Sequence, residues 1–225
     1  MRGWGDPPPL FLAVCIEGMM EIDVTGVLLA GGNSRRMGED KRYLVVGEQT
    51  LLARGLVVLR SIFQEVLVII AQDSLPLNVD ARVVRDLVPD CGSLGGLYTG
   101  LTQATTPYIF VVACDMPFLD PAVITQFTSR RASADIVMAK LAARLHPMHA
   151  LYSKGCLPVL EQMIRARQLK IQEMVSHSSL HVRYVTDADL LTIDPSGRSF
   201  QNVNTPADLE VARSLISQLP SSGHL

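Results

Sequence analysis

Two adjacent glycines followed by a group of cations are the residues of this chain that point most clearly to chemistry. The apolar run from Val27 to Ala30 stops at Gly31 and Gly32, and four cations follow within positions 35 to 42, among them Arg36 and Lys41. Glycines let backbone N–H groups close around an anion because no Cβ stands in the way, and Arg or Lys adds positive charge. The pattern, which has neither the Walker nor the Rossmann glycine spacing, indicates a strand that ends in a phosphate-binding loop. A tight strand-to-helix turn is the alternative for a bare Gly-Gly pair, but the cations favour a phosphate.

A carboxylate stands where the most strand-like run of the chain ends. Asp115 directly follows the apolar segment from Tyr108 to Cys114 and precedes Met116 and Pro117. Ligands of open α/β sheets bind beyond the carboxyl ends of the strands, so we expect Asp115 to face the same crevice as the glycine loop. Beside nucleotide phosphates a carboxylate is most useful as a ligand of Mg²⁺, which prefers hard oxygen donors. The alternative is an Asp that only begins the Asp-x-Pro turn.

Two asparagines near the C-terminus share one face of an extended segment. Asn202 and Asn204 are two residues apart, so their side chains leave the same side while Val203 points the other way. Two neighbouring carboxamides offer neutral oxygen ligands or N–H donors to a cluster of metal and phosphate. Turn chemistry before the helix-capping pattern of Thr205 and Asp208 is the alternative.

A second glycine-rich turn follows Asp86. Ser93 is expected to cap a helix that carries Gly95 and Gly96 in its first turn. Glycines at a helix N-terminus allow an anion or a base edge to approach, and they equally allow close packing of helix on sheet, so both interpretations stay open.

The five histidines supply no convincing metal site. His146 with His149, and His177 with His181, have spacings that a metal could use, but no Cys or carboxylate completes either pair. We interpret them as surface or loop residues. No G-x-S-x-G motif points to a serine nucleophile.

Strands and helices alternate along the chain, which predicts an α/β fold with one twisted, mostly parallel sheet and helices on both faces. Strands are expected at 27–30, 66–71, 82–84, 108–114, 135–139, 148–152 and 182–185, and helices at 51–63, after 93, and at 121–131, 156–167, 171–177 and 206–218. We expect residues 1–20 to be a disordered N-terminal extension, residues 21–219 to form a single domain, and residues 220–225 to be a loose tail.

Composition narrows the function class. With 225 residues, of which 48% are hydrophobic, the chain is long enough to bury a sizeable core, and its formal net charge is only −2. It has neither the basic excess of a nucleic-acid-binding protein nor an apolar run of about 20 residues that could span a membrane. Its four cysteines form no C-x-x-C pair, which favours reduced thiols in the cytoplasm.

The chain resembles a known family in four ordered blocks. LAGGNSRRMGEDK at residues 29–41 is similar to the opening signature of the molybdenum cofactor guanylyltransferases, within the nucleotidyltransferase superfamily. The segment at 86–96, CDMPF at 114–118 and NVNTPADL at 202–209 resemble later blocks. The resemblance implies a Rossmann-like nucleotidyltransferase fold. It also implies transfer of GMP from Mg²⁺-bound GTP to the terminal phosphate of molybdenum cofactor, with release of pyrophosphate.

The resemblance also implies roles for individual residues. The implied catalytic residues are Lys41, Asp115 and Arg36, with Asp115 also the Mg²⁺ ligand. The implied nucleotide-binding residues are Leu29, Ala30, Gly31, Gly32, Lys41, Asp86, Gly95 and Asp115. The implied substrate-binding residues are Asn202, Asn204, Arg144 and His146, the last two in a charged loop that faces the pterin. The implied partners are GTP, molybdenum cofactor, and a molybdoenzyme or its chaperone.

Ser93 and Gly95 depart mildly from the family pattern, and one further departure bears on the choice of base. Ile70 stands where the aligned second strand of the family has an Asn that contacts the nucleotide, which weakens the case for guanine. A molybdenum cofactor cytidylyltransferase is therefore an alternative, although its loop usually opens Ala-Ala-Gly. A sugar-1-phosphate nucleotidyltransferase and a non-catalytic nucleotide-binding or cofactor-delivery module are further alternatives. Intact Lys41 and Asp115 argue against a delivery module.

Overall fold

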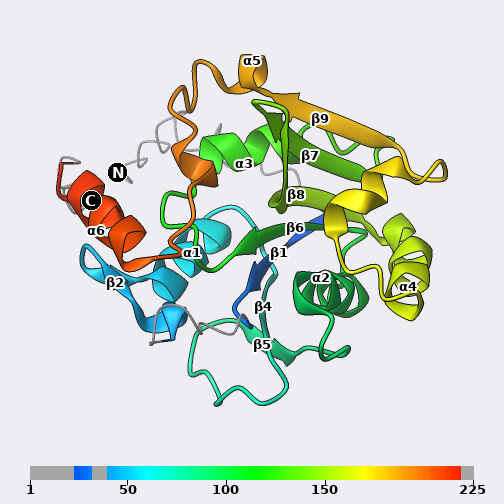
Figure 1. Cartoon of the computed structure of the whole chain (residues 1–225), viewed down its shortest axis with the longest axis horizontal. Coiled ribbons are helices and arrows are strands. Elements are labelled where there is room, and N and C mark those ends of the chain that lie inside the picture. Colours follow the sequence, from blue (N-terminus) through cyan, green and yellow to red (C-terminus); the bar gives the residue numbers. More distant parts are fainter. Residues whose placement is uncertain (1–22, 32–39, 219–225) are drawn as a thin grey trace, which may run out of the picture.

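A seven-stranded sheet forms the centre of the protein (Figure 1). The structure is a computed structural model that describes residues 23–31 and 40–218. The predicted extension at 1–20, the predicted tail at 220–225, and Gly32 and Arg36 of the glycine loop lie outside the described residues. The domain boundaries therefore remain predictions.

The sheet is mostly parallel, as the sequence predicts. In order across the sheet its strands are β5 (Arg82–Arg85), β4 (Val66–Ile70), β1 (Val24–Leu29), β6 (Tyr108–Ala113), β8 (Arg144–Ser153), β7 (Ile136–Leu141) and β9 (Val182–Thr186). The first four run parallel to one another, and β9 is parallel to β7. The long apolar runs become the central strands because a strand covered on both faces buries every side chain.

The sequence does not predict the direction of β8, which runs antiparallel between β6 and β7. Ala142 and Ala143 connect β7 to β8, with φ of 43° and 65°. Left-handed backbone at two central residues is the geometry of a tight hairpin turn, which Gly and Asn normally mark. Because two alanines carry no such signal, the hairpin is not visible in the sequence.

Helices cover both faces of the sheet and bury separate cores. They are α1 (Leu51–Arg60), α2 (Gly92–Gln103), α3 (Pro121–Thr128), α4 (Leu157–Arg165), α5 (Asp187–Leu190) and α6 (Pro206–Ser217), with the 3-10 helices η1 (Lys41–Tyr43), η2 (Lys154–Cys156), η3 (Ile171–Ser176) and η4 (Arg198–Phe200). Helices α1, α3 and α6 pack on the face that carries Leu28 and Phe110, whereas α2 and α4 pack on the face that carries Val27 and Ile109. Neighbouring strand residues thus supply opposite cores, as period-2 geometry requires.

Capping residues set several helix boundaries. Thr50 Oγ1 accepts from Ala53 N at 3.2 Å at the start of α1, as predicted. The cap predicted for Ser93 is wrong, because α2 begins at Gly92 and has no side-chain cap bond. Gly92 has a φ of 56°, which glycine tolerates, so the chain enters the helix one residue before Ser93.

Two smaller predictions also need correction or completion. The helix predicted at 171–177 is the 3-10 helix η3, and a short antiparallel pair, β2 (Val45–Val46) and β3 (Gln49–Thr50), lies between η1 and α1. Among residues 23–31 and 40–218, no helix is long and apolar enough to cross a membrane.

Candidate active site

Asp115 lies at the carboxyl edge of the sheet, directly after β6. Cys114 N donates to Leu29 O at 3.0 Å, which places the residues after β6 beside the end of β1 and the start of the glycine loop. Gly31 is closely packed at this edge, since a Cβ there would lie 2.9 Å from Ala71 N. Gly31 therefore has a packing reason to be glycine, in addition to the phosphate role predicted for it.

Four side chains predicted for the site meet at this edge. Lys41 Nζ donates to Asp115 Oδ2 at 3.1 Å and to Asn204 Oδ1 at 2.9 Å. Asn202 Nδ2 donates to the second carboxylate oxygen, Asp115 Oδ1, at 3.1 Å. The Lys41 and Asp115 side chains are 21% and 17% exposed, so a small ligand can reach them. We call Lys41, Asp115, Asn202 and Asn204 the Lys41–Asp115 cluster.

Lys41 is held at the start of a capped turn. Asp40 precedes η1, and its carboxylate accepts from Arg42 N at 3.0 Å and from Arg42 Nε at 2.9 Å. These hydrogen bonds, chiefly the side-chain one, lower the pKa of Asp40. Arg213 Nε of α6 donates to Val45 O of β2 at 3.0 Å, and α6 lies beside β2 in Figure 1. This contact brings the C-terminal segment next to the turn that carries Lys41.

The two asparagines leave the same face of the segment between η4 and α6, as predicted. Val203 is buried, whereas Asn202 and Asn204 are exposed. Val203 N donates to Asp115 O at 2.8 Å, which ties the segment to the end of β6. Asp208 accepts from Asn204 N at 2.9 Å, and this hydrogen bond is the main cause of the lowered pKa of Asp208. The sequence shows Asp208 as a helix cap but does not show that it also fixes the Asn204 backbone.

Asp86 follows β5, three strands away from Asp115 across the sheet. Its Oδ1 accepts from Val88 N at 3.0 Å and from Thr99 Oγ1 at 2.8 Å. A Cβ on Gly95 would lie 2.7 Å from Val88 O and 2.9 Å from Asp86 Oδ2. Close packing therefore accounts for Gly95, and the nucleotide-binding roles of Asp86 and Gly95 remain predictions.

Ile70 does not bear on the choice of base. Its side chain is 2% exposed and belongs to the core on the α1 face of the sheet. A buried side chain cannot contact a bound nucleotide, so the argument that Ile70 weakens the case for guanine is wrong. The exposed residue nearest to it along the chain is Gln72, whose Nε2 donates to Asp86 O.

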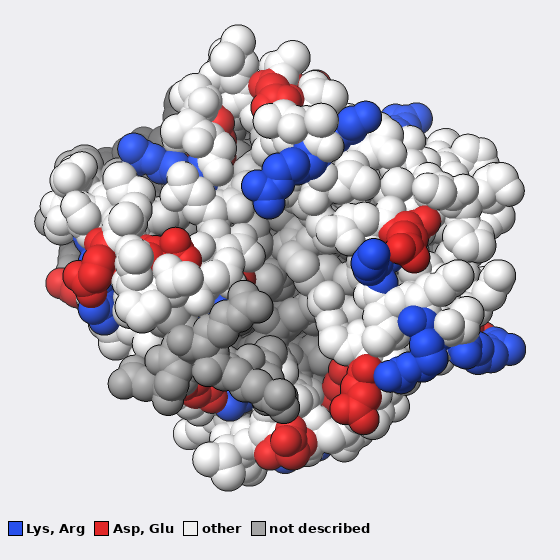
Figure 2. All heavy atoms as spheres, viewed as in Figure 1, with Lys and Arg blue, Asp and Glu red and all other residues white. Residues whose placement is uncertain are grey.

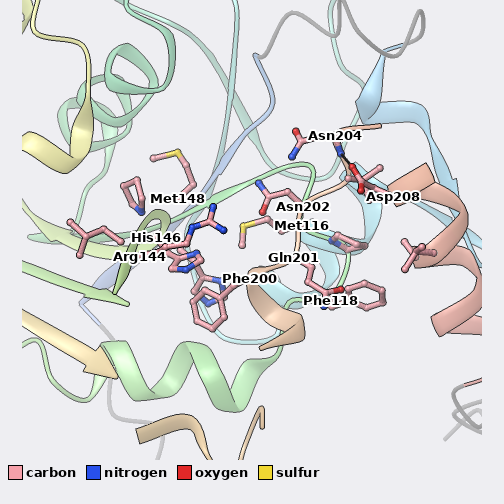
Figure 3. Close-up of a pocket in the computed structure, with 17 residues that line it drawn as sticks. Met116, Phe118, Arg144, His146, Met148, Phe200, Gln201, Asn202, Asn204 and Asp208 are labelled. Carbon is pink, nitrogen blue, oxygen red and sulfur yellow. Dashed lines mark hydrogen bonds between the residues drawn. The ribbon is translucent and has the colours of Figure 1, made fainter. Parts of the chain in front are cut away.

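A pocket of about 570 Å³ opens beside the Lys41–Asp115 cluster. In Figure 3, Arg144 and His146 lie on one side, Asn204 and Asp208 on the other, and Asn202 between them. The four side chains predicted for the substrate thus line one cavity. Figure 2 shows this face of the molecule hollowed near its middle, with acidic and basic side chains scattered around the hollow instead of gathered into one charged surface.

The histidine interpretation is wrong for this part of the chain. β8 begins at Arg144, so Arg144 and His146 lie on a strand and not on a loop. His146 is partly buried against Phe200, and burial, then the charge of Arg144, lowers its pKa. His149 is fully buried. The alternation of polar and apolar residues from Arg144 to Pro147 is the signal that could have shown the strand, but it breaks at Met148 and so does not predict the burial of His149.

The donor set of the cluster suits phosphate better than a metal bound by protein alone. No group of three His, Cys, Asp or Glu residues that could hold a metal occurs in the described part of the chain. Mg²⁺ is commonly bound through one or two carboxylates together with substrate phosphates and water. One carboxylate at Asp115, with Asn204 Oδ1 bonded to the same Lys41 Nζ as a further oxygen donor, fits that pattern, whereas Asn202 presents its Nδ2 to Asp115.

Comparison with known proteins decides the family. The model of the MobA-like NTP transferase domain matches residues 26–182. The chain belongs to this family. A probable molybdenum cofactor guanylyltransferase from Pelotomaculum thermopropionicum is 36% identical over 85% of this chain and 93% of that protein. A molybdenum cofactor guanylyltransferase from Desulfosudis oleivorans is 35% identical over 86% of this chain and 96% of that protein.

The fold agrees with this membership. The solved structure of molybdopterin-guanine dinucleotide biosynthesis protein A from Archaeoglobus fulgidus has a TM-score of 0.77 and 26% identity, and the match covers 87% of this chain and 100% of that chain. As a MobA-like NTP transferase, the protein is a nucleotidyltransferase with a Rossmann-like fold. Nucleotidyl transfer is generally assisted by a divalent cation that neutralises phosphate charge.

Proposed function

We propose that this MobA-like NTP transferase moves GMP from GTP to the terminal phosphate of molybdenum cofactor and releases pyrophosphate. Relatives that match nearly the whole domain carry the name molybdenum cofactor guanylyltransferase. The observation that carries the proposal is the Lys41–Asp115 cluster at the edge of the sheet where the glycine loop begins.

The reaction needs charge neutralisation more than proton transfer. A terminal phosphate is already anionic at neutral pH, so no general base has to create the nucleophile. Lys41 provides mobile positive charge for the α-phosphoryl group and the leaving pyrophosphate, and Arg36 is proposed to add to it. The exposed carboxamides of Asn202 and Asn204 donate hydrogen bonds that orient the acceptor phosphate.

Asp115 is the proposed ligand of Mg²⁺, and Asn204 Oδ1, which accepts from the same Lys41 Nζ, is a further proposed oxygen donor. When bound, Mg²⁺ would neutralise phosphate charge and help to align the reacting groups. Lys41 already contacts Asp115 and Asn204, so the carboxylate and the cation are held in place before substrate arrives. Such preorganisation lowers the cost of arranging charges during the reaction.

The acceptor is proposed to occupy the pocket beside the cluster. Arg144 can pair with an anionic group of the pterin, and His146 packs edge-to-face against Phe200 at the wall of the cavity. Leu29, Ala30 and Gly31 at the end of β1, with Asp86 and Gly95 across the edge, are proposed to bind GTP.

The cellular setting is also proposed. The described cysteines Cys91, Cys114 and Cys156 are free thiols, which suits the reducing cytoplasm. A molybdoenzyme or its chaperone is proposed to receive the product.

The test is pyrophosphate release by purified protein with Mg²⁺ and molybdenum cofactor, with GTP, CTP, ATP and UTP offered separately. We expect release with GTP alone. Release with CTP alone would keep the nucleotidyltransferase chemistry and overturn the choice of base. Binding of GTP without release of pyrophosphate from any nucleotide would point to a cofactor-delivery module.

A further inference from the structure

His149 is a fully buried polar residue that belongs to none of the roles proposed above. It lies on β8 inside a row of aromatic side chains. Its ring centroid is 5.3 Å from that of Phe110, 5.4 Å from that of Phe127 and 4.5 Å from that of Phe200. Phe200 ends η4, directly before the segment that carries the two asparagines of the cluster. His149 therefore connects the core of the sheet to that segment.

Among the described residues, the His149 ring makes one hydrogen bond. His149 Nδ1 lies 3.2 Å from Ser199 O. A carbonyl oxygen can only accept, so Nδ1 carries the proton and donates. Burial lowers the pKa of His149 to about 3, and the ring therefore stays neutral at physiological pH. Its protonation state and the direction of this hydrogen bond are fixed.

The second ring nitrogen indicates that His149 does more than fill space in the core. Nε2 is buried and has no hydrogen-bond partner among the described residues. An apolar side chain of similar size would fill the same space without burying an unpaired nitrogen. The contribution that an apolar residue could not make is the bond from Nδ1 to Ser199 O.

That bond lies at the start of a segment whose register matters. Phe200 N and Gln201 N donate to Gly197 O and Arg198 O within η4, and the next backbone bond that reaches another element is that of 2.8 Å from Val203 N to Asp115 O. Because extended residues alternate between two faces, a slip of one residue would turn Asn202 and Asn204 away from the site and present their neighbours. The start of the segment is held at Ser199, whose N–H donates to Asp194 Oδ2 at 2.9 Å and whose carbonyl accepts from His149, the tie that reaches the sheet.

We propose that His149 is a positioning residue that fixes the register of residues 199–204 and thereby holds Asn202 and Asn204 against Asp115 and Lys41. The link to substrate binding rests on the proposed guanylyl transfer. The link to register rests on the fold alone, and the two can be measured separately.

Three variants separate the hydrogen bond from packing. His149→Asn retains a donor near the position of Nδ1, whereas His149→Leu retains volume and loses the donor. Phe63→Leu is the matched control, because Phe63 is 3% exposed and stacks on Phe110 at the other end of the same aromatic row. Should His149→Leu fail to fold, His149→Met, which also keeps volume and lacks the donor, takes its place.

Amide hydrogen exchange tests the register without any substrate. Relative to Ala30 N, which donates to Ile69 O within the sheet, the Val203 amide should exchange roughly tenfold faster in His149→Leu. The ratio of the Val203 exchange rate to the Ala30 exchange rate should stay near the wild-type value in His149→Asn and should be unchanged in Phe63→Leu. Equal ratios in the Leu and Asn variants, or the same change in Phe63→Leu, would overturn the proposal.

Kinetics then test the link to function. In His149→Leu the KM for molybdenum cofactor should rise by roughly tenfold while the KM for GTP changes little. In His149→Asn the KM for molybdenum cofactor should stay near the wild-type value. Equal rises of both KM values would contradict a role through the asparagines. If wild-type protein releases no pyrophosphate with any nucleotide, the proposed function fails, and the exchange ratio still decides the positioning role.

Discussion

Asp115 and Asp86 both follow parallel strands at the same edge of the sheet, yet the two carboxylates are held in opposite ways. Asp115 is bonded by the side chains of Lys41 and Asn202, which lie 74 and 87 residues away in the chain. Asp86 is bonded by Val88 N and Thr99 Oγ1 within its own βα unit.

The difference separates a carboxylate that can change partners from one that is fixed. Lysine and asparagine side chains can rotate toward phosphate oxygens and leave Asp115 available to a cation. A backbone N–H and a threonine on α2 hold Asp86 Oδ1 in place, so Asp86 can act on a ligand only through Oδ2 and without moving. The comparison predicts large kinetic effects at Asp115 and modest, mainly structural effects around Asp86.

The largest effect is expected for Asp115→Asn. This change keeps the shape of the side chain and removes its charge, so kcat should fall by roughly 10³-fold and the Mg²⁺ concentration for half-maximal activity should rise. Steady-state pyrophosphate release over a Mg²⁺ titration measures both. Asp120→Asn is the matched control, because Asp120 caps α3 five residues later and should keep near wild-type rates. A wild-type kcat in folded Asp115→Asn would contradict the large kinetic effect that the comparison with Asp86 predicts for Asp115.

The next effect is expected for Lys41→Met, which removes the cation of the cluster and keeps much of the stem. A loss of roughly 10²-fold in kcat is expected, with a smaller change in the KM for GTP. Lys154→Met serves as the control, since Lys154 donates to Ala104 O away from the cluster. Similar losses in both variants would assign Lys41 a structural role only.

A smaller effect is expected for Thr99→Val, which removes the hydroxyl donor to Asp86 and keeps the size of the side chain. The free energy of unfolding should fall by about 1–3 kcal/mol, because the bond to Asp86 Oδ1 is lost and Leu87 N loses its acceptor. The KM for GTP should rise while kcat changes little. Thr102→Val, on the same helix but bonded to Tyr98 O, should change neither kinetic constant. Denaturant unfolding and initial rates test both expectations.

The smallest effect is expected for Asp208, which holds the backbone of Asn204 in the Lys41–Asp115 cluster. Its pKa is lowered below 3.8, chiefly by the bond from Asn204 N. A lowered carboxyl pKa adds stability that is complete above the unfolded value and is lost as pH falls through the folded value. Between pH 5 and pH 2, the melting temperature of Asp208→Ala should therefore fall less steeply than that of wild type.

Asp189→Ala provides the control for this pH experiment. Asp189 forms the same kind of capping box with Thr186 at α5, and its carboxylate bonds Thr186 and Arg130 and no residue of the cluster. It should flatten the melting profile in the same way without raising the KM for molybdenum cofactor, whereas Asp208→Ala should raise that KM. Equal kinetic behaviour of the two variants would mean that Asp208 does not support Asn204.

Much of this site is visible in the sequence because its residue types are unusual in their settings. A glycine pair followed by cations, a carboxylate after an apolar run and two alternating asparagines are each recognisable in the sequence. The edge of the sheet brings the cation Lys41, the carboxylate Asp115 and the two asparagines together. The strands β1, β4 and β6 are predicted for a similar reason, since long apolar runs are buried on both faces.

The features of the fold and the site that the sequence does not predict depend on tertiary contacts, and no local sequence pattern indicates them. The hairpin that reverses β8 has two alanines with left-handed backbone instead of Gly or Asn. The burial of His149 is set by rings from other elements, and residue type alone suggests a surface position.

The chain order of the cluster has a consequence for biosynthesis. All seven strands of the sheet are complete at Thr186, but Asn202 and Asn204 come later and are fixed by α6, which ends at Ser217. The framework can thus assemble during translation while the acceptor side of the site is still missing. If the two asparagines orient the acceptor as proposed, a chain that stops before α6 has all seven strands but an incomplete acceptor site, and activity requires α6 to dock beside β2.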